Sequence, residues 1–424
     1  MIVEEKINKF KDKNIVVVGL ARSGAGAANL LSALGARVTV TDKKSRESLN
    51  DSIKKLSPSV NVITDGNPPE IFDRADMVVL SPGVPLDAPL LDRARTKGIP
   101  VIGELELAYQ AIKTEQRAKS KEQRAKKAEH GKLLTPHFIG ITGTNGKSTT
   151  TTLVDLMLKE SGFKTLLGGN IGNALTEEIL KAHPLSLDYI VAEISSFQLE
   201  TIEEFRPRIA AILNITPDHL DRYEGMEDYL DAKLRIFENQ MPEDFLVLNA
   251  DDDVLMKLYD SRFKIQNSKS PRVLFFSRKR EVEGVYFKDG MIYLNSSYFS
   301  LPASHFPLIS QKEIKIQGVH NIENAMAAAL VSLVAGCSPD AVRNVLKSFP
   351  GLEHRLEFAG EVRGVKFIND SKGTNVGAVL KSLEGFENVI LIMGGLDKGS
   401  DFSILKNPVE QKVKALVLIG KAKD

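Results

Sequence analysis

Short apolar segments alternate with helix-like segments along the first hundred residues of this chain. Four of these segments end in a glycine or a polar turn: IVVVG at 15–19, RVTVTD at 37–42, MVVLSPG at 77–83 and PVIG at 100–103. Between the first two, residues 25–34 have a helical pattern, and Gly35 suits the position just after the helix end. Strands that alternate with helices form parallel sheets, so the pattern predicts an α/β fold of the doubly wound type.

The same pattern starts again twice further along the chain. FIGITG at 138–143 is a predicted strand, residues 147–160 a predicted helix, and TLLGG, YIVAEIS, AAILNIT and FLVLNAD are four further strands. VYFKDGMIYL at 285–294 predicts a hairpin around Asp289-Gly290. An alanine-rich helix follows at 320–336, and a third unit with strands in KFIND, VILIMGG and KALVLIG starts near Pro350.

Length and composition place the chain among multidomain globular proteins. Its 424 residues allow about two to four domains. The 56 basic and 55 acidic residues give a net charge of +1, which argues against a general nucleic-acid binder. The single cysteine, Cys337, excludes an internal disulfide framework and a thiolate zinc cluster. With no apolar run near 18 residues and no signal-peptide core, we expect a soluble cytoplasmic protein with no membrane partner.

A basic, polar stretch at 112–136 interrupts the α/β pattern. The pentamer EQRAK occurs at 115–119 and again at 122–126, a period of seven residues. A heptad this polar has no apolar seam with which to pair as a coiled coil. We expect an insertion that forms a solvated helix or a disordered linker, and weak polyanion binding is the alternative.

The segment GITGTNGKST at 140–149 lies between a predicted strand and a predicted helix, as a phosphate-binding loop does. Gly143 and Gly146 let backbone N–H groups turn toward an anion, Lys147 supplies a positive charge, and the Ser148 hydroxyl can bind Mg²⁺. The strict P-loop pattern has a glycine where this chain has Ile141, so the loop is a variant. We predict ATP binding; the alternative is a glycine turn that only caps the helix.

A second glycine-rich segment, GLARSGAG at 19–26, resembles the dinucleotide fingerprint, but Ala21 replaces its middle glycine. Asp42 ends the next strand, where an acid that binds a ribose would lie. The segment predicts a nucleotide site of some kind at this edge of the sheet. A nicotinamide oxidoreductase is the alternative, and it leaves the loop at 140–149 unexplained.

Glu193 and His219 each lie near the end of a predicted strand, where ligands bind in open α/β sheets. A carboxylate suits Mg²⁺, and an imidazole can join a mixed site. On spacing alone, His219 is as well explained as a structural loop histidine. Lys233, in the predicted helix DAKLRIF, has the pattern of an ordinary lysine on an amphipathic helix.

Taken together, nine motifs resemble the Mur ligase family, the ATP-dependent amino-acid ligases of peptidoglycan synthesis. The resemblance covers nearly the whole chain outside 112–136, and its motifs stand in family order. They are GITGTNGKST, GGNIG (168–172), AEISSFQLE (192–200), LNITPDHLDRY (213–223), AKLRIFEN (232–239), GVHNIENAMAA (318–328), His354-Arg355, NDSKGTN (369–375) and MGGLDKG (393–399).

The resemblance implies three α/β domains. A Rossmann-like domain at 1–111 would bind the UDP part of a sugar nucleotide, which explains why the dinucleotide fingerprint is imperfect. After the insertion at 112–136, a P-loop ATPase-like domain at 137–349 would bind ATP. A Rossmann-like C-terminal domain would begin at 350, and we expect it to be incomplete over 350–424, because the family continues through a further helix and strand.

The resemblance also implies roles for individual residues. Those implied for the UDP-sugar are Arg22, Ser23, Gly24, Asp42, Lys43, Ser81, Gly83 and Asn170. Those implied for ATP are Gly143, Thr144, Asn145, Gly146, Lys147, Ser148, Thr149, Asn321, Asn324, Arg355 and Asp370. Ser148, Glu193, His219 and Lys233 would serve two Mg²⁺ sites, with Lys233 carbamylated by CO₂, and Lys372, Thr374 and Lys398 would bind D-glutamate.

The reaction implied is the addition of D-glutamate to UDP-N-acetylmuramoyl-L-alanine through an acyl phosphate, with Lys147, Glu193, His219 and Lys233 as catalytic residues. We expect a monomer that acts on small molecules and has no nucleic-acid partner. Two alternatives remain: a sister Mur-type or folylpolyglutamate-type ligase, and a truncated ATP-binding chain that does not ligate.

Overall fold

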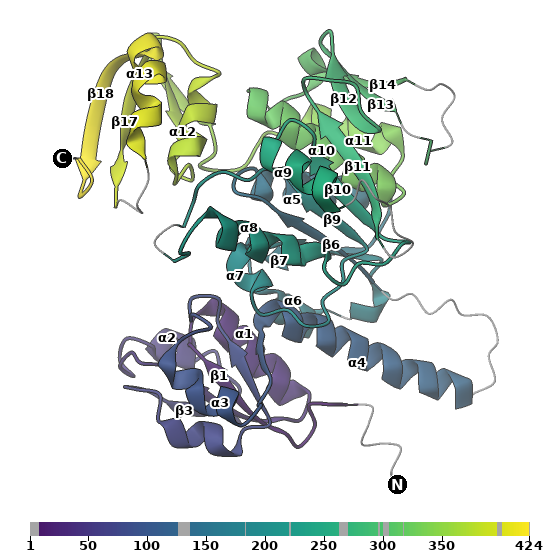
Figure 1. Ribbon diagram of the computed structural model, residues 1–424, viewed down its shortest axis with the longest axis vertical. Coiled ribbons are helices and arrows are strands. Elements are labelled where there is room, and N and C mark those ends of the chain that lie inside the picture. The colour runs from purple at the N-terminus through teal and green to yellow at the C-terminus, as the bar shows by residue number, and fades with distance from the viewer. Residues whose placement is uncertain are drawn as a thin grey trace. The chain divides into compact units, whose positions relative to one another are not determined.

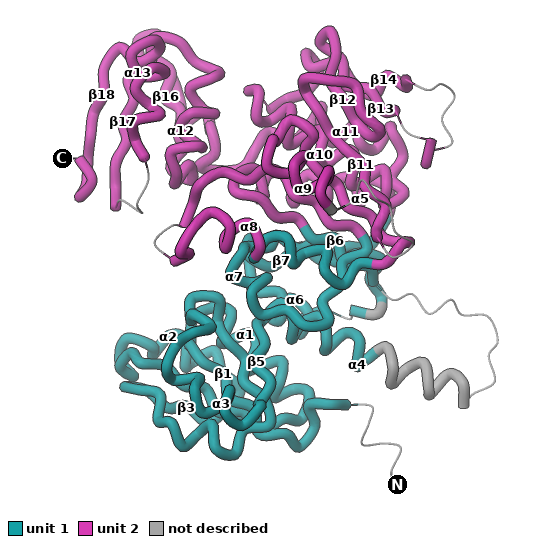
Figure 2. The backbone as a smooth tube through the Cα atoms, viewed as in Figure 1, with its two compact units in different colours: residues 1–140, 163–208, 232–240 teal, residues 141–162, 209–231, 241–424 magenta. Residues whose placement is uncertain are grey.

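The computed structural model describes residues 8–125, 136–182, 184–219, 222–262, 270–295, 297–299, 305–316, 318–396 and 401–423. The chain divides into two compact units, shown in Figure 2. Unit 1 comprises residues 1–140, 163–208 and 232–240, and unit 2 comprises 141–162, 209–231 and 241–424. The three-domain boundaries expected from the sequence stay a prediction.

The N-terminal part of unit 1, which carries the labels β1, β3 and α1 to α3 in Figure 1, is built on a five-stranded parallel sheet. Its strand order is β3-β2-β1-β4-β5. The strands are β1 (Asn14–Val18), β2 (Arg37–Thr41), β3 (Asn61–Ile63), β4 (Met77–Leu80) and β5 (Val101–Gly103). Their connections hold α1 (Arg22–Ala33), α2 (Asn50–Ile53), η1 (Pro69–Arg74), η2 (Pro89–Leu91) and α3 (Asp92–Thr96). The predicted parallel α/β fold is confirmed here.

A valine-rich core explains why this sheet forms. Val17 of β1 lies beside Val40 of β2 and Val79 of β4, and all three are buried. Phe72 of η1 and Leu91 of η2 cover one face and are fully buried. Burying a side chain of this size contributes roughly 1.5–3 kcal/mol to the stability of the fold. Strands that carry buried β-branched residues on both faces are typical of parallel sheets.

The rest of unit 1 contains a long helix, α4 (Glu104–Ala125), which runs through the predicted boundary at residue 111. Ile112 and Thr114 are buried, so the first residues of the predicted insertion pack against the protein rather than stand in solvent. The helix ends at Ala125, and residues 126–135 of the insertion lie outside the described residues.

Unit 1 also holds the strands that carry part of the candidate site. β7 (Thr165–Gly169) and β8 (Tyr189–Glu193) pair in parallel, and β6 (His137–Thr142) runs from unit 1 into unit 2. The helical segments are α6 (Leu175–Lys181), η3 (Pro184–Ser186), α7 (Ser196–Leu199) and η4 (Arg235–Phe237). Ser195 and Gln198 form a reciprocal capping box that begins α7 directly after Glu193 and Ile194.

In unit 2, six strands follow one another in the order β14-β13-β12-β11-β10-β9. They are β9 (Ile209–Ile212), β10 (Phe245–Asn249), β11 (Arg272–Ser277), β12 (Gly284–Lys288), β13 (Met291–Asn295) and β14 (Phe306–Ser310). β9 to β12 are parallel, and β12 to β14 form antiparallel pairs. The predicted hairpin is confirmed: Asp289 and Gly290 both have positive φ, as its tight turn requires.

Helices of unit 2 pack against these strands and against one another. They are α5 (Lys147–Glu160), α8 (Met226–Leu234, which continues into unit 1), α9 (Asp253–Arg262), η5 (Gln311–Glu313), α10 (Val319–Val334) and α11 (Pro339–Ser348). The alanines of α10 are almost all fully buried, and their small side chains let this helix contact β9 to β12 and α5. This contact brings the start of α10 to the start of α5.

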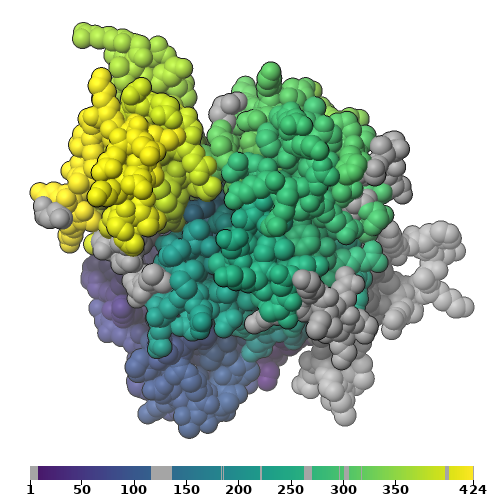
Figure 3. Space-filling model, turned by 45° about the horizontal axis from the view of Figure 1, so that its top comes forward, coloured from purple at the N-terminus to yellow at the C-terminus, as the bar shows by residue number. Residues whose placement is uncertain are grey.

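The C-terminal part of unit 2 consists of two small sheets. β15 (Glu357–Val362) pairs antiparallel with β16 (Val365–Asn369), and β17 (Val389–Gly395) pairs parallel with β18 (Val413–Gly420). The helical segments are α12 (Val376–Leu383), η6 (Phe402–Leu405) and α13 (Lys406–Lys412). Many apolar side chains here face solvent: Ile392 is 65% exposed and Phe358 59%, and the segment runs from yellow-green to yellow in the space-filling view (Figure 3).

Glu104, the first residue of α4, is a buried acid in unit 1. Its Oε1 accepts hydrogen bonds from Thr176 N, at 2.6 Å, and from Thr176 Oγ1, at 2.8 Å, so it holds the start of α6. Its Oε2 is buried without a hydrogen-bond partner among the described residues. Burial raises the pKa of Glu104 above 4.5, and the hydrogen bonds from Thr176 oppose that shift only in part.

We expect the Glu104→Gln variant to gain stability relative to wild type as pH rises. The folded-state pKa lies above the unfolded one, so the native protein holds the proton more tightly, and that stabilisation is lost as pH rises through the folded pKa. Glutamine keeps the Oε1 acceptor and does not ionise. Urea unfolding of both proteins from pH 4 to pH 8 measures the difference, and a difference that stays constant with pH contradicts it.

No helix in the described ranges combines the length and the apolar character that crossing a membrane requires.

Candidate active site

The predicted phosphate loop connects β6 to α5 in unit 2. Gly146 caps α5 with φ +83°, and a Cβ there would collide with Oδ1 of Asn324. Gly143 has φ +150°, and a Cβ there would lie 3.0 Å from Cβ of Leu213. Residues with side chains rarely adopt these conformations, so both glycines are needed for the chain to turn here.

Hydrogen bonds fix the loop between these glycines. Thr144 Oγ1 lies 3.0 Å from Thr216 O and 3.1 Å from the Tyr229 hydroxyl, and it accepts from Thr216 N at 3.0 Å. Asn145 N donates to Asn214 Oδ1 at 2.8 Å, and Asn214 Nδ2 donates back to Asn145 O at 3.1 Å. Asn214, Thr216 and Tyr229 were missed by sequence reasoning as supports of the loop, although Asn214 and Thr216 lie inside a quoted motif.

Lys147 and Arg355 supply positive charge at the start of α5. Lys147 Nζ donates to the carbonyl oxygens of Gly143 and Thr144, at 2.9 Å each. Arg355 Nη2 donates to Ser148 Oγ at 3.0 Å. The structure thus brings together three residues that the sequence predicts to contact ATP, at a helix N-terminus whose dipole also favours an anion.

Asn321 and Asn324 share the first turns of α10. Asn324 Nδ2 donates to Asn321 Oδ1 at 3.2 Å, and its Oδ1 lies 3.4 Å from Thr150 Oγ1 on α5. Asn324 therefore lies beside the phosphate loop, as a residue that contacts a bound nucleotide should. His320 comes directly before Asn321 in the sequence, and burial lowers the pKa of its imidazole.

Asp370 follows β16 and holds the predicted D-glutamate segment in place. Its Oδ1 accepts from Leu356 N at 3.2 Å, and its Oδ2 accepts from Ser382 Oγ at 2.6 Å. Lys372 and Thr374, two residues and four residues further on, are exposed. Lys398, the third predicted D-glutamate residue, lies outside the described residues.

His219 has a positive φ of 56°, which is rare for a residue other than glycine. Its backbone N–H donates to Asp218 Oδ1 at 3.0 Å, and the ring nitrogen Nε2 lies 3.8 Å from Asp218 Oδ2. Its ring lies 6.5 Å from that of Tyr229, the same tyrosine that contacts the phosphate loop. His219 lies on the loop that follows β9. Backbone conformations of this kind are often found at functional sites.

In unit 1, the buried Glu193 at the end of β8 pairs with Asn170, an exposed residue that directly follows β7. Asn170 Nδ2 donates to Glu193 Oε1 at 2.7 Å, and Asn170 N donates to Glu193 O at 2.9 Å. Glu193 is 2% exposed, and its Oε2 has no hydrogen-bond partner among the described residues. A buried carboxylate oxygen left open in this way has the donor chemistry that Mg²⁺ prefers.

Lys233, on the last turn of α8, is 2% exposed. Lysine is almost never this buried in a soluble protein unless it is paired or functional. Its burial therefore argues against an ordinary surface lysine, which its sequence pattern alone suggested.

The predicted metal ligands are divided between the units: Glu193 and Lys233 belong to unit 1, Ser148 and His219 to unit 2. Within the parts of the chain that the structure describes, no three His, Cys, Asp or Glu side chains gather as a metal site.

The predicted UDP-sugar residues of unit 1 lie where β1, β2 and β4 end. Asp42 Oδ2 accepts from Leu20 N at 2.7 Å, and Ser81 Oγ donates to Gly19 O at 2.8 Å. A Cβ at Gly24 would collide with Gly19 O, so the turn needs glycine there. These residues lie at the carboxyl ends of adjacent strands, where nucleotides bind in doubly wound sheets.

The other predicted UDP-sugar residues surround this turn. Arg22 begins α1 and donates through Nη1 to Gly172 O, in the GGNIG segment that also carries Asn170. Ser23 follows it on α1, while Lys43 and Gly83 are exposed after β2 and β4. The helices α1 and α6 approach closely, since a Cβ at Gly26 would lie 2.7 Å from Thr176 Oγ1.

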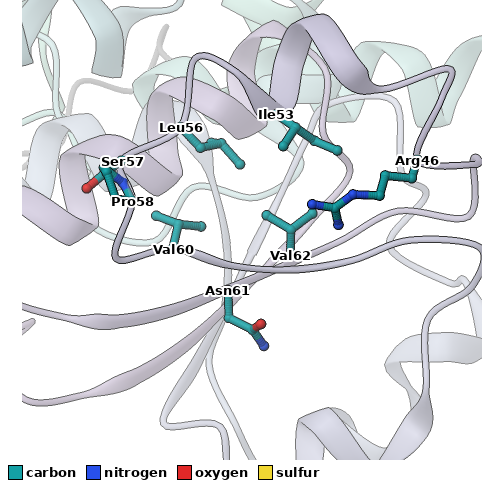
Figure 4. A pocket seen from close by; sticks show the side chains of 8 residues that line it. All are labelled: Arg46, Ile53, Leu56, Ser57, Pro58, Val60, Asn61 and Val62. Atoms are coloured by element: carbon teal, nitrogen blue, oxygen red, sulfur yellow. The ribbon is translucent and has the colours of Figure 1, made fainter.

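A shallow hollow of about 330 Å³ lies beside β3 and is separate from these residues (Figure 4). Its apolar side chains include Ile53, Leu56, Val60 and Val62, with Arg46 at one end. None of the predicted UDP-sugar residues lines it. It therefore forms no part of the predicted substrate site.

Comparison with known proteins decides the family. The family model described as "Mur ligase middle domain" matches residues 141–332, and "Mur ligase MurD-like, N-terminal domain" matches 13–103. The UDP-N-acetylmuramoylalanine–D-glutamate ligase of Koribacter versatilis (strain Ellin345) is 43% identical over 416 residues, which cover 97% of this chain and 84% of that protein. This chain belongs to the Mur ligase family. The resemblance inferred from the nine motifs is thereby confirmed.

Solved structures show that this Mur ligase shares the fold of other family members. A crystal structure of MurF from Acinetobacter baumannii aligns with a TM-score of 0.58 at 18% identity, over 96% of this chain and 80% of that one. MurF from Thermotoga maritima, solved in complex with ADP, aligns with a TM-score of 0.54 at 16% identity, over 91% and 85%. The predicted α/β multidomain fold of the Mur ligase is therefore confirmed.

Proposed function

We propose that this Mur ligase joins D-glutamate to UDP-N-acetylmuramoyl-L-alanine in an ATP-dependent step of peptidoglycan precursor synthesis. The observation that carries the proposal is the 43% identity, over 97% of the chain, to the Koribacter ligase named for that reaction. The phosphate loop supports it independently, because its glycines and Lys147, with Arg355 beside them, place donors and positive charge that can bind an anion at the start of α5.

In the proposed reaction the substrate's L-alanyl carboxylate attacks the γ-phosphorus of ATP. The bond from that phosphorus to the bridging oxygen breaks, ADP leaves, and an acyl phosphate forms. The amine of D-glutamate then attacks the acyl carbon. The adduct loses a proton and expels inorganic phosphate, which leaves the new amide. The first step crowds several negative charges together, so the protein has to supply oriented cations and donors.

The residues of unit 2 can meet this need. Lys147 Nζ donates to two loop carbonyls, and a bound phosphate could accept hydrogen bonds from this ammonium group in their place. Arg355 is already within hydrogen-bond distance of Ser148 and adds a second positive charge beside the loop. Asn321 and Asn324 would contact the adenine, and Asp370 would contact another part of the nucleotide, as the family resemblance implies.

Mg²⁺ would neutralise phosphate oxygens when bound, and we propose Ser148, Glu193 and His219 as its ligands. The open Oε2 of Glu193 supports this assignment. We also propose that Lys233 carries a carbamate, which would convert a buried cation into an oxygen-donor anion. Its nearly complete burial supports a functional role for the side chain.

We propose that the enzyme works in the cytoplasm as a monomer on small-molecule substrates. The nucleotide sugar would be held by the residues implied for it: Arg22, Ser23, Gly24, Asp42, Lys43, Ser81, Gly83 and Asn170. The D-glutamate would be held by Lys372, Thr374 and Lys398. The near balance of basic and acidic residues supports small molecules over a polyanion as the partner.

A phosphate-release assay with UDP-N-acetylmuramoyl-L-alanine, ATP and a panel of amino acids tests the proposal. We expect release that depends on D-glutamate, with the amide product detected by mass. Release with another amino acid instead would favour a sister Mur-type or folylpolyglutamate-type ligase. ATP turnover without any amide would favour a nucleotide-binding chain that does not ligate, and either result would exclude the proposed reaction.

A further inference from the structure

Three sequence segments with predicted functions meet at the side chain of Asn375. This residue caps α12, where its Oδ1 accepts a hydrogen bond from Ala378 N at 2.8 Å. Its Nδ2 donates to Asn145 Oδ1 and to Asp218 Oδ2, at 3.2 Å each. One half-buried amide therefore joins the phosphate loop, the loop that carries His219, and the end of the NDSKGTN segment.

The two acceptors of Asn375 are themselves held in place. Both the N–H and the carbonyl of Asn145 are bonded to the side chain of Asn214. Asp218 uses its other oxygen, Oδ1, to accept the N–H of His219. Because both partners are fixed, the position of Asn375 depends on the conformation of the phosphate loop, and the reverse also holds.

On the other side, Asn375 belongs to a turn whose position is well determined. Asp370 accepts hydrogen bonds from Leu356 N and from Ser382 Oγ, which joins the start of this turn to the residue before β15 and to the end of α12. Gly373 N donates to Asp370 O at 2.8 Å within the turn. A shift at Asn375 therefore moves Lys372 and Thr374 with it.

We propose that Asn375 is a positioning residue that couples nucleotide binding at the phosphate loop to the segment 370–375. This inference rests on the proposed function, because the proposed function assigns D-glutamate to Lys372 and Thr374. Asn375 itself was not among the site residues predicted from the motifs. Coupling of this kind is reciprocal, so the bound nucleotide orders the amino-acid segment and the bound amino acid strengthens nucleotide binding.

The Asn375→Ser variant removes the coupling and keeps the helix cap. Serine is a good N-cap, but its hydroxyl is too short to reach the two acceptors of the amide. Losing two hydrogen bonds should weaken ADP binding by roughly tenfold. The KM for ATP and D-glutamate should rise by a similar factor, with the KM for the UDP-substrate unchanged. Calorimetric titration with ADP and steady-state kinetics measure these quantities.

A reciprocal exchange separates coupling from a general packing role. Asn375→Asp alone keeps the cap but places a carboxylate 3.2 Å from Asp218, so it should be worse than Asn375→Ser. Adding Asp218→Asn restores a donor–acceptor pair in the opposite sense, and the Asn145 amide can turn to donate. We expect the double variant to recover ADP affinity to within a few-fold of wild type. Additive losses would overturn the proposal.

A control and a separate readout keep this inference distinct from the proposed function. Asn344→Ser, at an exposed asparagine of α11 that bonds to Glu160, should leave ADP affinity unchanged. ADP affinity does not require ligation. If wild type fails to ligate D-glutamate, the proposed function is wrong, but the coupling can still be tested. Unchanged ADP affinity in Asn375→Ser would overturn the coupling. A loss of ADP affinity that the double variant recovers would support it.

Discussion

The Lys147→Ala variant is expected to lose D-glutamate-dependent phosphate release by about 10³-fold or more. Lys147 Nζ lies over the carbonyls of the loop that would hold the ATP phosphates, and alanine leaves the charge of the transferred phosphoryl group without its nearest cation. Arg355 remains, which is why some residual rate is expected. Phosphate release with both substrates at saturation measures the loss, and titration with ADP measures the accompanying fall in affinity.

Lys257→Ala provides the matched control, because Lys257 is an exposed lysine on α9 of the same unit. It should leave the rate and the ADP affinity unchanged. Lys147 is partly exposed, so water can reach the loop carbonyls after its removal, and we expect little change in the urea midpoint. Release that still depends on both substrates at close to the wild-type rate would exclude the proposed role of the loop.

Residues that follow strands or open helices were predictable from the sequence. Gly143, Gly146 and Lys147 stand between a strand and a helix, and the structure places them there with the positive φ values and helix-start position that the loop requires. The hairpin at Asp289-Gly290 was predictable for the same reason: local backbone chemistry limits which residues a tight turn accepts. In both cases the determining interactions lie within a few positions along the chain.

Residues whose roles depend on distant contacts were not predictable. Asn214 supports Asn145 from 69 positions away, and Asn375 contacts Asn145 from 230 positions away. Both lie inside quoted motifs, but no local pattern shows which residue either one contacts. The boundary at 111 was likewise placed by a change in composition, whereas α4 continues through it because Ile112 and Thr114 still find buried surroundings. Packing, which composition does not record, keeps Ile112 and Thr114 away from solvent.

The Glu193→Gln variant is expected to lose about 10²–10³-fold in ligation while it stays as stable as wild type or becomes more stable. Glutamine keeps an oxygen for the hydrogen bond from Asn170 Nδ2, but it removes the negative charge that would bind Mg²⁺. The other oxygen, Oε2, has no hydrogen-bond partner among the described residues, so the change breaks no hydrogen bond that the structure shows.

Two measurements separate a metal ligand from a structural residue at this position. A ligand role predicts a higher Mg²⁺ concentration for half-maximal rate, together with an equal or higher urea midpoint in metal-free buffer. Glu177→Gln, which breaks an exposed ion pair with Lys181 in the same unit, should change neither quantity noticeably. If Glu193→Gln instead lowers the urea midpoint and leaves the Mg²⁺ dependence unchanged, the carboxylate supports the fold through Asn170 and does not bind the metal.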